Sequence, residues 1–274
     1  MIIGSLLDAG LEFNILEREI GKLPIPGVHL SSTKVTRQSL VATKFNVLDQ
    51  SSTAFRHLSD LNKIVDTSPH SSFIKEKAKA IFLKLAEAEA RCHGIPLQEV
   101  HFHEIGAADT IVDVVGALVG IEHLGIQRVL SSPLNLGSGS VSFSHGTYPV
   151  PAPATAELLR EVPVYSTDTR SELVTPTGAA ILTTLADQFG LMPQLIINST
   201  GYGAGTRELT SPNVLRIFVG ETVTKRIDGH EVASVLETNI DDMNPEVFEV
   251  VMESLFNGGA LDVYFSSYWD NLIY

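Results

Sequence analysis

The sequence predicts an α/β protein of mixed α+β character, with one large domain followed by a short second unit. Stretches whose apolar residues recur every three to four positions, typical of helices, alternate with stretches rich in β-branched residues, typical of strands. The polar run "ETVTKRIDGH" over residues 221–230 interrupts this pattern and is typical of a linker. We therefore expect a large domain over residues 1–220 and a separate unit over 231–274.

The predicted elements of the large domain follow from these two periodicities and from capping and turn residues. Gly10 suits the end of the first helix, Ser72 and Gly94 the two ends of the longest one, and Thr175 with Pro176 the start of the last. In chain order, we expect helices over 1–10 and 13–23, a strand pair over 28–49, helices over 55–66 and 72–93, an extended segment over 99–104, a helix over 109–124, a strand over 129–137, a loop over 137–150, helices over 149–159 and 173–189, a strand and glycine loop over 195–209, and a strand over 213–220.

The short second unit is predicted to contain a strand over 232–240, a helix over 245–259 and a strand over 260–265. A strand, helix and strand alone cannot bury the apolar face that they present. We therefore expect this βαβ unit to be the first part of a longer domain, which leaves the unit dependent on a partner.

Composition limits the classes of function. The 274 residues include 44% hydrophobic ones, and the formal net charge of −13 argues against a surface for nucleic acids or anionic membranes. A single cysteine, Cys92, excludes an intrachain disulfide and fits a reducing compartment. The sequence contains no uncharged apolar stretch of about 18 residues and no basic start typical of a secretion signal. We expect a soluble, cytoplasmic protein.

The stretch "EVHFHEIGAADTIVDVVGA", residues 99–117, contains five side chains that can bind a metal or carry a proton. In an extended strand His101 and His103 would share one face, and imidazole suits nickel, zinc, copper and iron. On the next helix Asp109 and Asp113 are four residues apart and share a face. If the chain turns back at Gly106, all of these side chains can converge with Glu104 on one metal. His101 and His103 on a solvated strand face, with Asp109 as a helix cap, remain the alternative. Asp113 favours a site, because a carboxylate among apolar neighbours is rare unless it is paired or binds a cation.

Two further stretches have residues suited to a site. In "FSHGTYPVPAPAT", His145 lies in a loop that prolines stiffen, although a histidine in such a loop can also be a plain surface residue. In "LVTPTGAA", Thr175 and Thr177 stand at a helix start, where free N–H groups can bind an anion or the hydroxyls can simply cap.

A third stretch, "GYGAGTRE", places glycines at positions 201, 203 and 205 before Arg207. Glycines permit close approach of the backbone to a phosphate, and an arginine can pair with it; a tight turn is the alternative. Together with the threonine-containing helix start, this stretch hints at a phosphorylated ligand.

Six stretches, taken in order, resemble the nickel-insertion proteins of nickel-pincer cofactor biosynthesis, the LarC family. They are "EVHFHEIGAADTIVDVVGA", "SHGTYPVPAPATAELL", "ELVTPTGAA", "GYGAGTRE", "PNVLR" and "LETNIDDMNPE". The resemblance implies a nickel chelatase, or cyclometallase, of the lyase class. Such an enzyme inserts nickel into pyridinium-3,5-bisthiocarboxylic acid mononucleotide, in a reaction that depends on CTP with Mg or Mn, and so forms the cofactor of lactate racemase.

The resemblance also implies roles for residues of this chain. His101, His103, Glu104, Asp109, Asp113 and His145 would hold nickel, and one of the first three would take the ring proton as the base. Thr175, Thr177, Gly201, Gly203, Gly205 and Arg207 would hold the substrate's phosphate. Family members often carry a histidine-rich tract before this region; in "LDQSSTAFRHLSD" only His57 remains.

The two ends differ from the family pattern. Family members begin with a strand and loop before the stretch that matches "MIIGSLLDAG", and they continue after residue 265 into a full ferredoxin-like domain that binds CTP. We therefore expect this chain to be an N-terminal fragment whose last unit is an incomplete ferredoxin-like βαβ unit and whose partner is the C-terminal half of such a protein. Association of several copies, as a homo-oligomer, stays open.

Other classes of function remain open for the sequence. The main alternative is a nickel-binding delivery or storage module without catalysis. A metal-dependent hydrolase and a purely structural subunit are two more.

Overall fold

The computed structural model describes all residues except 51–56, 103–107, 144–145, 224–235, 237–243 and 266–274. The chain divides into two units, Met1–Thr224 and Lys225–Tyr274, at a point inside the predicted linker. In the described part of the chain, every helix is too short or too polar to cross a membrane. The secondary structure of the first unit confirms a mixed α/β fold.

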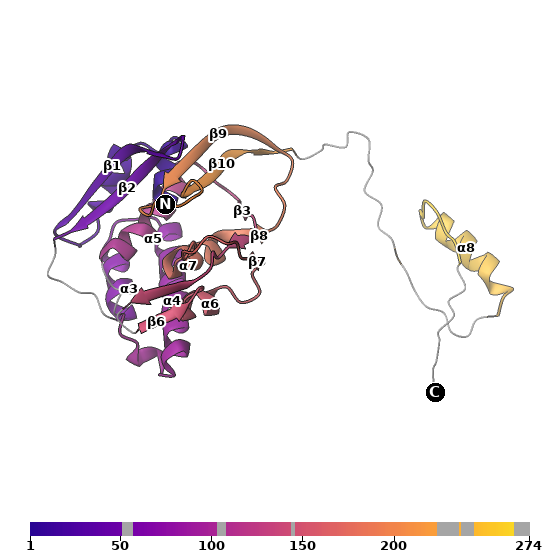
Figure 1. Cartoon of the computed structure of the whole chain (residues 1–274). Coiled ribbons are helices and arrows are strands. Elements are labelled where there is room, and N and C mark those ends of the chain that lie inside the picture. The colour runs from indigo at the N-terminus through magenta and orange to yellow at the C-terminus, as the bar shows by residue number, and fades with distance from the viewer. Residues whose placement is uncertain (51–56, 103–107, 144–145, 224–235, 237–243, 266–274) are drawn as a thin grey trace. The chain divides into compact units, whose positions relative to one another are not determined.

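A four-stranded sheet forms one layer of the first unit (Figure 1). Its order is β1-β2-β9-β10, with β1 at Val28–Arg37, β2 at Leu40–Asp49, β9 at Leu195–Ala204 and β10 at Val214–Thr222. The predicted strand pair over 28–49 is confirmed as an antiparallel hairpin. β9 and β10 form a second antiparallel pair, and the two pairs join through a parallel contact of β2 with β9 at Thr43 and Gly203.

Helix α1, Ile2–Asp8, packs directly on β9, and two glycines of the strand make this possible. A Cβ atom on Gly201 would stand 2.0 Å from the carbonyl oxygen of Ser5, and one on Gly203 would stand 2.0 Å from that of Met1. The prediction that these two glycines belong to a loop is therefore wrong. They lie inside β9, and because glycine has no side chain, the backbone of α1 can come this close to the strand at these two positions.

The predicted helices form a second layer, and α5 lies at its centre. α5 is buried over most of its length, and its Gly116 and Gly120 receive the side chains of Ile3 and Leu6 from α1. The helices of this layer are α2 (Phe13–Ile20), α3 (Leu58–Thr67), α4 (Ser72–His93), α5 (Ala108–His123), α6 (Pro153–Leu158) and α7 (Pro176–Leu185). Their apolar side chains form one continuous core with those of α1.

The caps confirm most of the predicted helix ends. Thr175 accepts a hydrogen bond from the N–H of Gly178, 3.3 Å away, with Pro176 at the first helical position of α7. Gly94 ends α4 in the left-handed conformation, at φ 63°. The predicted bounds of α4 are confirmed, and only its capping residue is corrected, since Ser71 rather than Ser72 accepts from the N–H of Ile74.

Short strands lie at the rim of the helical layer and correct three predictions. The helix predicted over 173–189 ends at Leu185, because β8 (Ala186–Phe189) pairs in parallel with β3 (Val129–Ser131). The loop predicted over 137–150 contains a hairpin of β5 (Ser140–Phe143) and β6 (Gly146–Pro149). The strand predicted over 129–137 is broken into β3 and β4 (Leu134–Asn135), and β4 pairs in parallel with β7 (Val164–Tyr165).

The second unit contains helix α8, Val247–Asn257, at the place predicted for a helix. Residues 260–265, predicted as a strand, form none in the structure. A strand needs a neighbour to take up its backbone N–H and C=O groups, and the described residues of this unit offer no such neighbour. Apart from Leu236, the strand predicted over 232–240 lies outside the described residues.

Candidate functional site

The two carboxylates of α5 lie on one face of that helix, as predicted. Burial raises the pKa of Asp113; the Met1 amino group opposes this rise, Asp109 adds to it, and Lys44 opposes it. Asp109 lies at the helix start, where its Oδ1 accepts from the N–H of Thr110 at 2.8 Å. The result is a shielded carboxyl, Asp113, that holds its proton more tightly than an exposed one.

The histidine part of the predicted cluster is only partly described. Leu97–Glu99 form a 3₁₀ turn, so the predicted extended segment is wrong at Glu99; Val100 has extended backbone angles, and Val100–Phe102 belong to none of the described strands. Burial nevertheless alternates as in extended chain: Val100 and Phe102 are buried and His101 is exposed. The core takes the apolar residues on either side of His101 and turns its imidazole outward.

A second histidine accompanies His101. The ring of His57, at the start of α3, lies with its centroid 4.3 Å from that of His101. The sequence marked His57 only as the remainder of a histidine tract, and the pairing could not be seen because the two residues lie on different elements. Two adjacent imidazoles are a ligand pair that suits nickel.

The convergence of the five metal-capable side chains is not seen among those the structure describes. His103, Glu104 and His145 lie outside the described residues. Within the described parts of the chain, no group of three or more His, Cys, Asp or Glu side chains is placed to hold a metal ion. His101 on one side and Asp109 with Asp113 on the other are thus two separate parts of the predicted nickel site, and its assignment stays a prediction.

The loop after β9 positions the last of the predicted phosphate residues. The N–H of Gly205 donates to the carbonyl oxygen of Asn213 at 2.8 Å, and a Cβ on Gly205 would stand 2.4 Å from Asn213 Nδ2. The same Asn213 Nδ2 donates to the carbonyl oxygen of Arg207 at 2.8 Å. Asn213 therefore fixes the turn that carries Thr206 and Arg207 out of the sheet.

Arg207 joins this loop to the segment that precedes α7, the helix whose start holds the predicted phosphate residues Thr175 and Thr177. Its Nη1 donates to Ser171 Oγ at 2.8 Å, only four residues before Thr175. The Thr175 hydroxyl caps α7. The structure thus links Arg207, through Ser171, to the segment that leads into α7, and it leaves Gly201 and Gly203 beneath α1.

Glu172 lies in the segment that leads into α7 and was not predicted. Burial raises the pKa of this carboxyl, and the backbone N–H of Ala152 and the charge of Arg207 oppose the rise. Its Oε1 atom is buried without a hydrogen-bond partner among the described residues. A buried oxygen of this kind has unused capacity to accept a proton or a hydrogen bond. The sequence offers no sign of it, since Glu172 stands in a polar run.

Lys44 of β2 also reaches this loop, where its Nζ donates to Thr206 Oγ1 at 2.5 Å. In the sequence it reads as an ordinary solvent-facing lysine of a strand. Its contact with Thr206 depends on the pairing of β2 with β9, which local patterns do not indicate.

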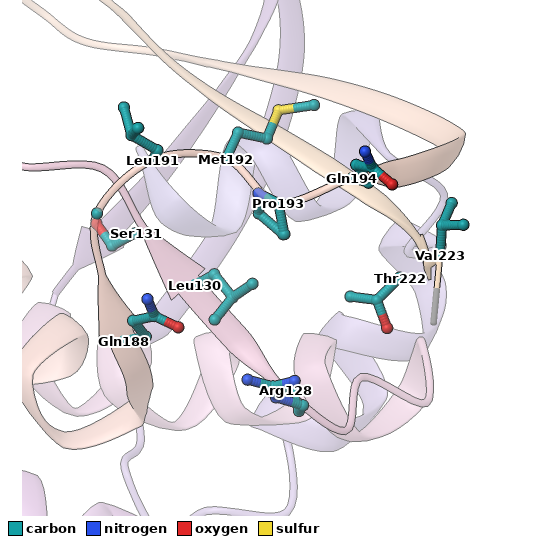
Figure 2. A pocket seen from close by; sticks show the side chains of 11 residues that line it. Arg128, Leu130, Ser131, Gln188, Leu191, Met192, Pro193, Gln194, Thr222 and Val223 are labelled. Carbon is teal, nitrogen blue, oxygen red and sulfur yellow. The ribbon is translucent and has the colours of Figure 1, made fainter. Parts of the chain in front are cut away.

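A surface hollow of about 450 Å³ lies elsewhere in the first unit. Figure 2 shows Leu130 between Arg128 and Pro193 in this hollow, with Thr222 at its side. Arg128 is the one ionisable side chain among the residues that line it, and none of the predicted site residues is among them. The hollow therefore lacks the groups that metal or acid–base chemistry needs, and the loop after β9 remains the stronger candidate.

The chain belongs to a family of metal-handling proteins, the nickel insertion proteins. The family model described as "Nickel insertion protein" matches residues 1–269, which is nearly the whole chain and includes all the site residues described above. The resemblance of the six stretches is thereby confirmed. Proteins of this family insert nickel into a cofactor precursor.

Individual relatives agree with this assignment. A protein of Dictyoglomus thermophilum is 48% identical over 264 residues, which cover 96% of this chain and 68% of the relative. The "Pyridinium-3,5-bisthiocarboxylic acid mononucleotide nickel insertion protein" of Desulfitobacterium hafniense strain DCB-2 is 45% identical over 268 residues, 96% of this chain and 67% of the relative. A protein of the same name from strain Y51 has the same identity and coverage. No solved structure matches this chain.

Proposed function

We propose that this chain inserts nickel into pyridinium-3,5-bisthiocarboxylic acid mononucleotide, the substrate that appears in the names of its Desulfitobacterium relatives. The observation that carries the proposal is the family match over residues 1–269. The side chains of the site fit the chemistry, because they combine nitrogen and oxygen ligands for a metal with donors for a phosphate.

Nickel is a substrate in this reaction, so its protein ligands must be replaceable. Imidazole and carboxylate groups bind Ni(II) and can give way to the thiocarboxylate sulfur atoms and a ring carbon of the pyridinium substrate. The proposed ligands are the predicted ones, namely His101, His103, Glu104, Asp109, Asp113 and His145. His57 is added to them as the neighbour of His101. A metal–carbon bond forms only if the ring proton leaves, and the proposed base is one of His101, His103 and Glu104.

The remaining parts of the proposal come from the family resemblance. They are dependence on CTP with Mg or Mn, a cytoplasmic location, and lactate racemase as the protein that receives the finished cofactor. The chain spans about two thirds of the length of the relatives it matches. Residues 231–274 contain no Lys or Arg, which makes them poorly suited to a triphosphate. We therefore propose that the C-terminal half of a family member supplies the CTP site.

An insertion assay tests this function. The purified chain would be incubated with nickel, the mononucleotide, CTP and Mg, with and without the C-terminal half of a full-length relative. We expect product only when both parts are present. Nickel bound in stoichiometric amount without product under either condition would favour the alternative, a delivery or storage module. Turnover by the chain alone would show that its own residues hold CTP.

The metal ligands are tested by equilibrium dialysis with Ni(II). His101→Ala combined with His103→Ala should weaken nickel binding by more than about tenfold, and wild-type binding should weaken below about pH 6, because imidazole must be neutral to bind a metal. His29→Ala combined with His123→Ala removes two histidines from other places and serves as the control. Equal affinity of both double variants would refute the assignment.

A further inference from the structure

Three cations meet on the loop after β9. Arg37, at the end of β1, donates through Nε and Nη2 to the carbonyl oxygen of Gly205, at 3.2 and 3.0 Å. Lys44, on β2, donates through Nζ to Thr206 Oγ1 at 2.5 Å. Arg207 is the next residue of the loop. We refer to Arg37, Lys44 and Arg207 as the cation cluster.

Among the described residues no carboxylate forms an ion pair with this cluster, although Glu172 lies close enough to feel the charge of Arg207. Of the ion pairs within 4.0 Å that join described residues, none involves Arg37, Lys44 or Arg207. The chain carries 32 acidic and 19 basic residues, so an unpaired cation is the less expected case, and three in one place are more so. Like charges held together repel one another, and a bound anion removes that repulsion.

The electrostatics of Lys44 agree with this arrangement. Burial lowers the pKa of the Lys44 ammonium, and the charge of Arg37 lowers it further. Asp113 acts in the opposite direction, but it lies beyond ion-pair distance and burial raises its own pKa. The lysine thus lacks a strong counterion in the protein itself.

Counting donors shows which groups are free to bind a ligand. Arg37 uses Nε and Nη2 on Gly205 and Nη1 on the carbonyl oxygen of Thr36, so it serves chiefly to hold the loop and to add charge. Lys44 spends one of its three N–H donors on Thr206, and Arg207 spends one of its five on Ser171. The Thr206 hydroxyl accepts from Lys44 and keeps its own hydrogen to donate. Thr206 and Arg207 are exposed and Lys44 is half-buried, so a ligand can reach these donors.

We propose that Lys44, Thr206 and Arg207 bind the phosphate monoester of the mononucleotide substrate, with Arg37 as a positioning residue. A phosphate monoester carries between one and two negative charges near pH 7 and offers three acceptor oxygens, which match two cations and a hydroxyl. This inference rests on the proposed function. It adds Lys44 and Thr206 to the predicted phosphate residues. It removes Gly201 and Gly203 from them, because α1 covers both glycines.

The test measures binding of a pyridinium mononucleotide, nicotinic acid mononucleotide, and of the corresponding nucleoside without its phosphate. Isothermal titration calorimetry on the 274-residue chain should show the nucleotide binding at least about tenfold more tightly than the nucleoside, and less so as salt increases. Lys44→Gln and Thr206→Val should each remove most of this difference without changing nucleoside binding. Lys44→Arg should keep part of it.

Lys79→Gln is the matched control. Lys79 is a half-buried lysine of α4 that pairs with Asp66 of α3, away from the cation cluster. Thermal unfolding of each variant identifies any that fail to fold. Wild-type chain that binds nucleotide and nucleoside equally, or Lys44→Gln that binds the nucleotide as the wild type does, would overturn the inference. Phosphate-dependent binding by a chain that inserts no nickel even with the C-terminal half of a relative would leave this site standing and contradict only the proposed function.

Discussion

The stretch "GYGAGTRE" contains two regions that are alike in sequence and different in structure. Gly201 and Gly203 lie inside β9, where the backbone of α1 occupies the space that side chains would fill. Gly205 lies just past the end of the strand, where Asn213 occupies that space, and it leads into the exposed side chains of Thr206 and Arg207. Regularly spaced glycines therefore indicate that another group lies close to the backbone. Only the fold shows whether that group is a helix or a ligand.

The region around Gly201 and Gly203 is a structural junction, completed by Asp8 at the end of α1. Asp8 Oδ2 accepts from the N–H of Tyr202 at 2.8 Å, and its Oδ1 accepts from Thr43 Oγ1 at 2.7 Å and from Lys34. One carboxylate thus ties α1 to β1, β2 and β9. The junction should respond to mutation through stability, and the loop with the cation cluster through ligand binding.

The largest effect is expected for Gly201→Ala. The new Cβ would stand 2.0 Å from the carbonyl oxygen of Ser5 and 2.8 Å from the backbone nitrogen of Ala9, so α1 must move away from the sheet. We expect the free energy of unfolding to fall by about 3 kcal/mol. Urea denaturation measures this change.

Gly190→Ala is the control for that experiment, since its nearest neighbour would be 3.9 Å away and its backbone conformation suits any residue. If both variants unfold at the same urea concentration, the tight packing between α1 and β9 does not exist in solution.

A smaller loss of stability is expected for Asp8→Asn. Burial alone would raise the pKa of Asp8, but hydrogen bonds from Lys34, Tyr202 and Thr43 outweigh it and leave the pKa below its usual value of 3.8. The folded state then binds the carboxylate's proton less tightly than the unfolded state does. This contribution is fully present above about pH 4 and is lost as the pH falls through the lowered pKa.

Replacing Asp8 by asparagine should cost about 2 kcal/mol at pH 7, because the partners of the carboxylate lose charge-assisted hydrogen bonds. The difference from wild type should shrink as the pH falls below 4. A difference that stays constant down to pH 2 would mean that the charge of Asp8 contributes nothing.

The loop should show the opposite behaviour, and Arg207→Ala tests it. We expect mononucleotide binding to weaken by about tenfold while Ni(II) affinity and the unfolding midpoint stay unchanged. Calorimetry and dialysis on one preparation measure both ligands. Arg216→Ala is the control, because Arg216 is an exposed arginine on β10 and is not part of the cation cluster. Parallel losses of both affinities, or none, would contradict the separation of phosphate and nickel binding.

The smallest expected effect is on the pH dependence of stability in the helical layer, which differs from that of the junction around Asp8. Burial lowers the pKa of His70, although the charge and backbone carbonyl of Glu19 oppose this. The unfolded state therefore binds a proton more readily, so stability falls as the pH drops below about 6.5. His70→Gln should flatten the stability profile between pH 6.5 and 5 and leave the loss below pH 4, which belongs to Asp8. A profile unchanged in the upper range would assign that slope to other groups.

Local patterns were sufficient for most of the elements. Helical periodicity and a following glycine predicted α4 correctly to within a residue, and β-branched alternation predicted the β1–β2 hairpin. Local preference predicts a helix for Ala186–Phe189, but its pairing with β3, more than fifty residues earlier, overrides that preference and makes it a strand.

The site was predictable only where its signals are local. Asp109 and Asp113 could be placed on one face because helix geometry fixes the spacing. Lys44 and Glu172 could not be found, since their environments arise from contacts between distant segments. The pairing of His57 with His101 belongs to the same class.

The parallel contact of β2 with β9 also sets the order of events when the chain is made. Thr43 pairs with Gly203, about 160 residues later, so the first hairpin leaves the ribosome long before its neighbour exists. At ordinary rates of synthesis the wait is roughly 8–30 s, far longer than a hairpin or helix needs to form. During that interval β2 is an open edge that could recruit another nascent chain, and a charged lysine on the strand opposes such pairing. Lys44 is such a lysine, and its charge is in place on β2 throughout this interval.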